Sequence, residues 1–270
     1  MYKIIFVDID GTLRNDKKEI TDRTKVAIHK IVEKGIPVVI CSGRPRQYTK
    51  KVSQEALASN YIIVCNGGEA YDYERKEVIY QNNLDNKEIL TLYQMAEKYD
   101  VQFIINLGEN RIVRNPTGNK TDIILKEPIE KFINAKSSTQ CIFSSMQLEK
   151  IKVIKEKIQS IKDLEIVNLS KCLTNYNEPE EKPFFLDIAS KSTSKGNAIK
   201  KLCEYLEIDL KDSVAIGDSY NDLTMFQVVG HTVAMGNAPD DIKKIVDEVT
   251  NTNNEEGVAK FLEKVYKEVF

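Results

Sequence analysis

Residues 3–12 read KIIFVDIDGT, and this stretch decides the fold. The apolar, β-branched run of residues 3–7 ends at two aspartates and a glycine, which is typical of a strand buried on both faces of a sheet. A helical pattern follows over residues 20–34, with Thr21 as candidate N-cap and Gly35 just beyond the last turn. A strand, a loop and a helix in this order indicate the first unit of a wound α/β sheet.

The same pattern recurs twice along the next part of the chain. Residues 37–41 and 61–65 predict two more strands, with a helix over residues 47–58 between them. Strands that alternate with helices predict a Rossmann-like wound parallel sheet with right-handed crossovers. Ligands of such sheets bind beyond the carboxyl ends of the strands, and these strands end there in DIDGT, CSGR and CNGG.

The middle of the chain, residues 83–186, predicts an inserted α+β domain with largely antiparallel pairing. Its expected helices cover residues 86–98 and 149–161, and its expected strands cover residues 101–107, 140–144, 165–168 and 173–177. The charged, proline-flanked stretch EPEEKP, residues 178–183, is the expected exit from this domain.

The wound pattern resumes with an expected strand at residues 184–188. Further core elements are expected as a helix at residues 195–206, a strand at 213–216, a helix through residue 226 and a strand at 232–235. We therefore predict a catalytic core made of residues 1–82 and 187–270, interrupted by the inserted domain.

Composition restricts the possible partners. The 270 residues carry a net charge of −2, so no global basic field favours nucleic acid or an anionic membrane surface. No apolar run approaches the roughly 20 residues that cross a bilayer, and we expect a soluble cytoplasmic protein. The five cysteines are scattered without a CxxC pair, which favours reduced, buried thiols over a zinc site.

Acidic side chains follow two of the predicted core strands. Asp8 and Asp10 follow the first strand, and Asp218 and Asp222 lie in GDSYND after the strand at residues 213–216. Asp8 and Asp10 could simply cap a turn, and Asp222 could cap the helix that follows it. Four carboxylates at one edge would repel one another unless a cation offset them, and Mg²⁺ prefers oxygen ligands. The sequence therefore predicts a Mg²⁺ site at this edge.

These stretches resemble a known family. DIDGT, Ser42 in CSGR, Lys195 in TSKGNAI, and GDSYND are similar to the four ordered motifs of the haloacid dehalogenase superfamily of phosphotransferases. The insertion after the second motif, together with CNGG and AMGNA (residues 234–238), resembles the Cof-like, type IIB branch. The resemblance implies a phosphatase with an inserted cap domain.

Phosphoryl transfer assigns roles to the motif residues. Asp8 is expected to attack phosphorus and form an aspartyl phosphate, while Asp10 protonates the leaving alcohol and later deprotonates water. The metal is expected on the Asp8 carboxylate, the Asp10 backbone carbonyl and Asp218. Lys195 and the Ser42 hydroxyl are expected to hold the transferring phosphoryl group.

The supporting residues have competing interpretations. The expected phosphate or substrate contacts also include Thr12, Gly43, Asn66 and Asn221, and Asp222 is expected to support Lys195 and the metal ligands. Ser42 and the Asn66-Gly67 pair could instead be turn residues, and Lys195 a solvated first-turn lysine. Arg44 either faces the substrate or pairs with a surface carboxylate, and the sequence does not decide between the two.

The predicted function is Mg²⁺-dependent hydrolysis of a small phosphorylated metabolite, either a sugar phosphate or a cofactor phosphate. A phosphosugar mutase is an alternative, because it would use the same aspartate pair. A receiver-like signalling domain or a metabolite-sensing module is the non-enzymatic alternative. The sequence does not indicate the individual substrate or the oligomeric state.

Overall fold

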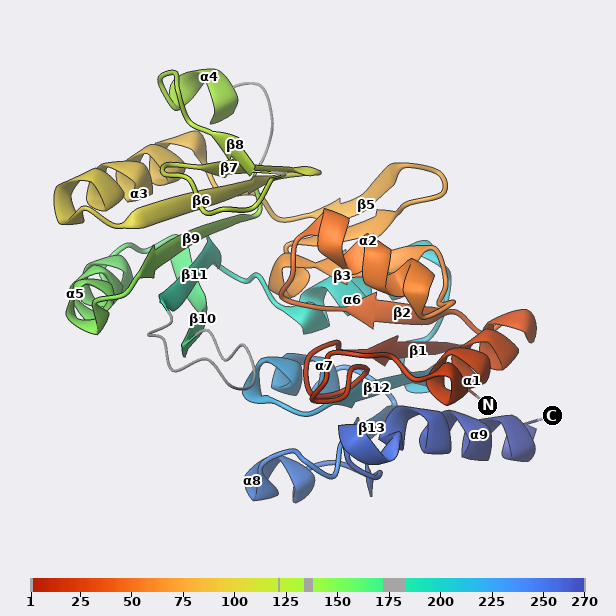
Figure 1. The fold of residues 1–270 in the computed structure, drawn as a ribbon. Coiled ribbons are helices and arrows are strands. Elements are labelled where there is room, and N and C mark those ends of the chain that lie inside the picture. Colours follow the sequence, from red (N-terminus) through yellow and green to blue (C-terminus); the bar gives the residue numbers. More distant parts are fainter. Residues whose placement is uncertain (1, 121, 134–137, 172–182, 270) are drawn as a thin grey trace. The chain divides into compact units, whose positions relative to one another are not determined.

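The computed structural model describes residues 2–120, 122–133, 138–171 and 183–269. The chain divides into two compact units (Figure 1), one formed by Met1–Tyr80 with Ser194–Phe270 and the other by Gln81–Thr193. We call them unit 1 and unit 2 and describe each by itself.

An eight-stranded sheet with the order β14-β13-β12-β1-β2-β3-β4-β5 forms the centre of unit 1. The strands are β1 (Ile4–Val7), β2 (Val38–Cys41), β3 (Tyr61–Val64), β4 (Glu69–Asp72), β5 (Glu77–Gln81), β12 (Ser213–Gly217), β13 (His231–Ala234) and β14 (Glu248–Val249). The six strands from β14 to β3 pair in parallel, as the wound-sheet prediction requires, and β4 pairs antiparallel with β3.

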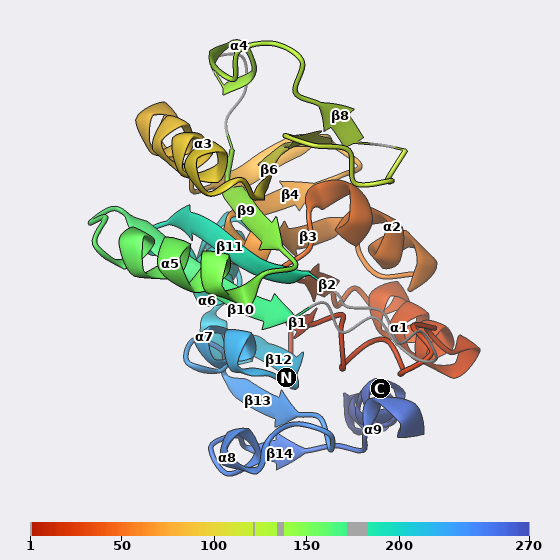
Figure 2. The same cartoon turned by 60° about the vertical axis from the view of Figure 1, so that its left-hand side comes forward.

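Helices cover both faces of this sheet (Figure 2). They are α1 (Asp22–Glu33), α2 (Arg46–Glu55), α6 (Lys195–Tyr205), α7 (Leu223–Phe226), α8 (Asp240–Lys243) and α9 (Gly257–Val269). Ile5 and Val7 of β1 pack in one apolar cluster with α1, α2 and α9, whereas Ile4 and Phe6 pack in another with α6, α7 and α8. All four β1 residues have no exposed surface, so this strand is a rigid base for the residues after it.

The start and end of α1 follow the predicted signals. The Thr21 hydroxyl accepts a hydrogen bond from the Thr24 backbone amide at 3.3 Å. Gly35 follows the helix with φ +83°, a conformation that glycine adopts without strain. The helix prediction for this segment is confirmed to within two residues at each end.

Unit 2 contains a six-stranded sheet with the order β10-β11-β9-β6-β7-β8. Its strands are β6 (Gln102–Leu107), β7 (Asn110–Val113), β8 (Asp122–Ile124), β9 (Gln140–Ser145), β10 (Leu164–Lys171) and β11 (Phe184–Ser190). Its helices are α3 (Asn86–Tyr99), α4 (Glu130–Ile133) and α5 (Leu148–Gln159). Pairing is antiparallel except between β7 and β8, which agrees with the predicted α+β character.

The strand predicted at residues 184–188 does not belong to the wound sheet, and that assignment is wrong. It is β11, which pairs antiparallel with β9 and β10 inside unit 2. Leu186 and Ile188 face the apolar cluster of unit 2, while Asp187 alternates to the other face. A one-sided apolar pattern suits an antiparallel strand, and a strand buried on both faces would not carry that aspartate. The strand predicted at residues 173–177 and nearly all of the exit stretch lie outside the described residues.

The structure also bears on two predictions that came from composition. Four of the cysteines, Cys41, Cys65, Cys141 and Cys203, are buried and form no disulfide within the described part of the chain, and Cys172 lies outside the described residues. Within the described ranges, every helix is too short or too polar to span a bilayer.

Gly67 lies in the turn after β3, at the point where this turn approaches the start of α6. A Cβ at Gly67, which has φ +91°, would lie 2.0 Å from the Ser194 carbonyl oxygen. Gly35 has a similar φ of +83° but no neighbour within 4 Å. We expect Gly67→Ala to lower the free energy of unfolding by roughly 2–3 kcal/mol more than Gly35→Ala does. Guanidinium denaturation of both variants measures this, and equal losses would mean that the turn shifts without cost.

Candidate active site

The chain folds back on itself directly after β1. The backbone amides of Leu13 and Arg14 donate to the carbonyls of Asp8 and Ile9 at 3.2 and 3.0 Å. Gly11 has φ +84°, and a Cβ there would lie 2.3 Å from Asp218, so glycine is needed for both conformation and space. This tight loop holds Asp8 and Asp10 at the carboxyl edge of the sheet.

Lys195 joins this loop to the second acidic stretch. Its ammonium lies 2.6 Å from Asp8 Oδ1 and 2.7 Å from Asp222 Oδ1, and its side chain is only 1% exposed. Lys195 is the first residue of α6, after Ser194, whose hydroxyl caps the helix by accepting from the Asn197 amide. The structure therefore places Lys195 inside the site and contradicts the alternative of a solvated lysine.

Asp222 holds the β12 loop as well as the lysine. Its Oδ2 accepts hydrogen bonds from the backbone amides of Asp218 and Ser219 at 3.0 and 3.1 Å. Both of its oxygens are thus occupied by Lys195 and by the loop. This agrees with the expected supporting role more than with a direct contact to a ligand.

A cation fits between the remaining carboxylates. One oxygen from each of Asp8, Asp218 and Asp222 lies within 4.8 Å of the others. Because Asp222 is engaged elsewhere, Asp8 and Asp218 are the carboxylates that could bind a metal, and oxygen donors of this kind suit a hard divalent ion. Thr12 donates to Asp218 Oδ1 at 2.8 Å, so its described contact orients a candidate metal ligand and not a phosphate.

Asp10 lies apart from this buried cluster. Its Oδ2 accepts from Arg44 Nε at 2.9 Å, and Lys18 Nζ lies 3.7 Å from its Oδ1. The carboxylate is one-third exposed. The structure thus pairs Arg44 with a carboxylate of the candidate site. The sequence had not decided between a contact to the substrate and a pair with a surface carboxylate.

Four of the candidate phosphate-binding residues lie close together, namely Ser42, Gly43, Asn66 and Asn221. Asn221 donates to Asn66 Oδ1 at 3.4 Å, and a Cβ added to Gly43 would lie 2.7 Å from that same oxygen. Ser42 is 2% exposed, and its hydroxyl accepts from the Arg44 amide. The loops after β2, β3 and β12 are therefore brought together as predicted.

Two features of this region were not recognised in the sequence. Cys65, Asn66 and Gly67 all have positive φ values, so the turn after β3 is held in a left-handed conformation. Arg46 makes a buried bidentate ion pair with Glu69 and stacks on a tyrosine ring. Arg46 lies three residues after Gly43, and Glu69 lies three residues after Asn66. This spacing does not predict the ion pair, because the sequence does not show that the two loops are in contact.

Asn237 holds the loop after β1 from the other side. Its Nδ2 donates to the Gly11 carbonyl at 2.8 Å, and its Oδ1 accepts from the Asn253 amide at 2.9 Å. It lies in the AMGNA stretch, for which the sequence alone indicated a resemblance but no contact.

Burial and the charges of neighbouring groups together determine the pKa values in the cluster. Burial raises the pKa of Asp8, Lys195 lowers it, and Asp222 and Asp218 raise it further, for a net increase. Burial lowers the pKa of Lys195, but Asp222 and Asp8 raise it by more. Burial and the charge of Asp222 raise the pKa of Asp218 to about 6. The cluster therefore favours binding a positive charge.

Asp10 shows the opposite effect. Burial acts to raise the pKa of Asp10, but the hydrogen bond and charge of Arg44, assisted by Lys18, outweigh it and lower this pKa. Asp10 is consequently ionised in the ligand-free site.

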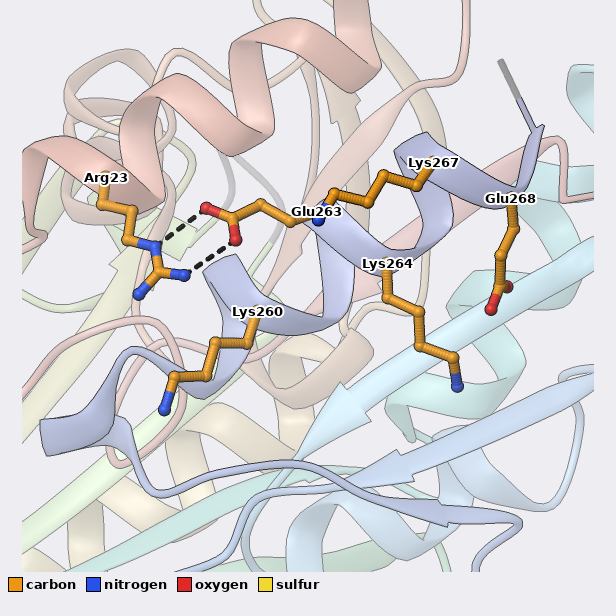
Figure 3. A pocket seen from close by; sticks show the side chains of 6 residues that line it. All are labelled: Arg23, Lys260, Glu263, Lys264, Lys267 and Glu268. Atoms are coloured by element: carbon orange, nitrogen blue, oxygen red, sulfur yellow. Dashed lines mark hydrogen bonds and ion pairs between the residues drawn. The ribbon is translucent and has the colours of Figure 1, made fainter.

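A pocket lies elsewhere on unit 1, where α9 meets α1 (Figure 3). Its lining residues are Arg23, Lys260, Glu263, Lys264, Lys267 and Glu268. Arg23 and Glu263 form an ion pair of 2.8 Å across it. None of the predicted site residues lines this pocket, so it is separate from the candidate active site.

The wound sheet presents an aspartate pair, a buried lysine and a second acidic loop at one edge, an arrangement suited to an enzyme that acts on phosphate esters. The chain belongs to the haloacid dehalogenase-like hydrolases, whose family model matches residues 5–262. It is 29% identical to the 5-amino-6-(5-phospho-D-ribitylamino)uracil phosphatase YcsE of Bacillus subtilis, over 96% of this chain and 93% of that protein.

Solved structures agree with this assignment. A haloacid dehalogenase-like hydrolase from Bacteroides thetaiotaomicron has a TM-score of 0.80 and 28% identity, covering 98% of this chain and 100% of that one. The subclass IIB sugar phosphatase BT4131 has a TM-score of 0.77 and 25% identity, covering 97% and 98%. The predicted family and the predicted phosphatase activity are confirmed, and the non-enzymatic alternatives are set aside.

Asp218 offers a test of the site that needs no substrate. A pKa near 6 in the folded protein, against about 4 in the unfolded chain, means that the folded state holds this proton more tightly. The contribution of Asp218 to the stability of the metal-free protein should therefore fall as the pH rises from about 4 to 6, and the loss should persist above pH 6. Asp218→Asn should then raise the free energy of unfolding at pH 7.5 by roughly 2–3 kcal/mol and change it little at pH 4.

Guanidinium titrations with a chelator at both pH values measure this difference. The matched control is Asp163→Asn, which removes an exposed carboxylate and should have almost no effect. Equal stability of wild type and Asp218→Asn at pH 7.5 would contradict the proposed electrostatic strain.

Proposed function

We propose that the protein hydrolyses small phosphomonoesters through an aspartyl-phosphate intermediate on Asp8, with Mg²⁺ as cofactor. The observation that carries this proposal is the buried cluster in which Lys195 forms ion pairs with Asp8 and Asp222, and a third carboxylate, Asp218, lies close to both of these aspartates. The excess negative charge suits a divalent cation, and the cation together with Lys195 suits a phosphate.

In the first step a carboxylate oxygen of Asp8 attacks phosphorus, and the bond from phosphorus to the leaving alcohol breaks. Asp10 gives its proton to that alcohol oxygen. In the second step Asp10 takes a proton from water, the water oxygen attacks phosphorus, and the bond to Asp8 breaks to release inorganic phosphate. Lys195 and the Ser42 hydroxyl hold the phosphoryl oxygens during both steps.

Mg²⁺ would be held by the carboxylates of Asp8 and Asp218 and by the Asp10 backbone carbonyl. When bound, it would offset negative charge on the phosphoryl oxygens. Lys195 and two backbone amides donate hydrogen bonds to both oxygens of Asp222. Asp8 and Asp218 lie in the same cluster with fewer such contacts, which supports their assignment as the metal ligands. Gly43, Asn66 and Asn221 would line the phosphate or substrate site next to Ser42.

Asp10 must carry a proton before it can act as an acid, yet Arg44 and Lys18 keep it ionised in the ligand-free site. The contact between Arg44 and Asp10 therefore has to give way when the substrate binds. A phosphate group would compete for the guanidinium, because charged oxygens are its preferred partners.

The substrate class is a sugar phosphate or a cofactor phosphate. The names of two similar proteins support a small phosphate ester as substrate, since one acts on a ribitylamino-uracil phosphate and the other is a sugar phosphatase. Unit 2 would act as a cap that selects among such esters, and the protein would work in the cytoplasm.

Removal of the metal tests the cofactor assignment. We expect a chelator to abolish release of inorganic phosphate from p-nitrophenyl phosphate and added Mg²⁺ to restore it. Mg²⁺ should also raise the melting temperature of the wild type but not that of Asp218→Asn. Full activity in excess chelator would refute the metal site, and transfer to a sugar without phosphate release would indicate a mutase.

The two aspartates are separated by their dependence on the leaving group. Asp8→Asn should lower kcat by at least about 10,000-fold with every ester, because no phosphoenzyme can form. Asp10→Asn should cost roughly 100- to 10,000-fold with an alkyl phosphate but much less with p-nitrophenyl phosphate, since nitrophenolate leaves without a proton. Burst kinetics of phosphoenzyme formation report the first step. Equal losses of Asp10→Asn on both esters in that step would mean that Asp10 is not the general acid.

A further inference from the structure

A buried ion pair lies beside the candidate phosphate site of unit 1 and takes no part in the proposed chemistry. Arg46 Nε donates to Glu69 Oε1 at 2.7 Å, and Arg46 Nη2 donates to Glu69 Oε2. The side chain of Glu69 is 3% exposed and that of Arg46 is 12% exposed. Arg46 Cζ lies 4.0 Å from the centroid of the Tyr71 ring, so the guanidinium also packs against an aromatic face.

The two partners belong to two neighbouring loops of the phosphate site. Arg46 is the first residue of α2, and the loop that leads to it from β2 contains Ser42 and Gly43. Glu69 is the first residue of β4, and it follows the turn that contains Asn66. The ion pair therefore connects the end of the loop after β2 to the end of the turn after β3.

Asn66 lies where these two loops are in closest contact. Its backbone amide donates to the Ser42 carbonyl at 3.1 Å. Its side-chain Oδ1 accepts from Asn221 at 3.4 Å and lies 2.7 Å from the position that a Cβ would have on Gly43. A displacement of one loop relative to the other would therefore move the Asn66 side chain out of this arrangement.

A buried ion pair contributes little net stability to such a contact. Removing two charged groups from water costs free energy that their attraction roughly offsets, and an apolar pair of similar volume often gives equal or greater stability. A bidentate contact between an arginine and a glutamate does fix distance and direction, because the planar guanidinium fork matches the carboxylate. The Tyr71 ring restricts the orientation of this fork further.

We propose that Arg46 and Glu69 are positioning residues for the phosphate site. Their ion pair holds the loop after β2 and the turn after β3 at the separation in which Asn66 meets Gly43 and Asn221. This inference rests on the proposed phosphatase function and deepens it, because it names residues that set the affinity for the phosphoryl group by acting through Asn66. The Asn66 side chain transmits the effect because Asn66 is only 5% exposed and has little freedom to adjust.

An apolar replacement of the ion pair separates positioning from stability. The variant is Arg46→Met/Glu69→Leu in the full-length enzyme with Mg²⁺. We expect its melting temperature to stay close to that of the wild type. The competitive inhibition constant of inorganic phosphate should nevertheless rise by about tenfold, and kcat/KM for p-nitrophenyl phosphate should fall by a similar factor.

The matched control replaces an ion pair of the same kind elsewhere on unit 1. Arg23 and Glu263 also form a bidentate contact, with two hydrogen bonds of 2.8 Å, and they line the pocket where α9 meets α1 (Figure 3). Arg23→Met/Glu263→Leu should leave the inhibition constant and kcat/KM within about twofold of the wild type.

Arg46→Lys tests the geometry with the charge retained. Lysine can still pair with Glu69 but has no planar fork, so we expect the inhibition constant of inorganic phosphate to rise by about tenfold. Asn66→Ala tests whether the effect passes through Asn66. It should raise the constant by about tenfold in the wild type, but by about twofold or less in the Arg46→Lys background.

The outcomes separate this inference from the function on which it rests. If the wild type releases no phosphate from p-nitrophenyl phosphate or from sugar phosphates, the proposed function fails and the inference fails with it. If the wild type is active but the folded apolar variant keeps the inhibition constant of the wild type, the inference alone is overturned. Where the apolar variant does not fold, an unchanged constant in Arg46→Lys has the same meaning. An equal loss in the Arg23→Met/Glu263→Leu control, or independent effects of Arg46→Lys and Asn66→Ala, would also overturn it.

Discussion

The burial of one ammonium group between two carboxylates is the constraint on which the rest of unit 1 depends. A lysine side chain that is 1% exposed is tolerable only with close ionic partners, and Asp8 and Asp222 provide them within 2.7 Å. These three residues come from the end of β1, the start of α6 and the loop after β12. The ion pairs therefore fix the positions of three elements at once.

The turn after β3 is adapted to this arrangement. Gly67 touches the backbone of Ser194 and Lys195 so closely that a side chain there has no space. The left-handed conformation of Cys65 and Asn66 permits this approach and turns Asn66 toward Gly43 and Asn221. Backbone strain at this turn is offset by the contacts that it makes possible, which include the buried pair of Arg46 and Glu69.

Much of the fold was predictable because its signals are local. Apolar runs that end in DIDGT, CSGR and CNGG identify parallel strands and the edge where a ligand binds, and caps such as Thr21 locate helix ends. β11 was assigned to the wrong sheet because a short apolar run does not reveal its partners. The available signal was Asp187, because a charged residue within the apolar run indicates that one face of the strand is polar and the other apolar.

The side-chain contacts were beyond sequence reasoning for a different reason. The pairing of Arg44 with Asp10 and the hydrogen bond from Asn106 to Gln140 depend on distances between loops and on the register of antiparallel strands. Neither is encoded in the spacing along one segment. The motifs identify the residues of the candidate site, but the contacts of these residues depend on how the chain folds in three dimensions.

The position of β1 in the middle of its sheet has a consequence for biosynthesis. Ile4 pairs with Ser213, so one side of β1 has no partner until β12 has been made. Unit 2 is continuous in sequence and can complete its own sheet in the meantime. Until then the nascent chain exposes one edge of an apolar strand, a state prone to aggregation and suited to capture by chaperones.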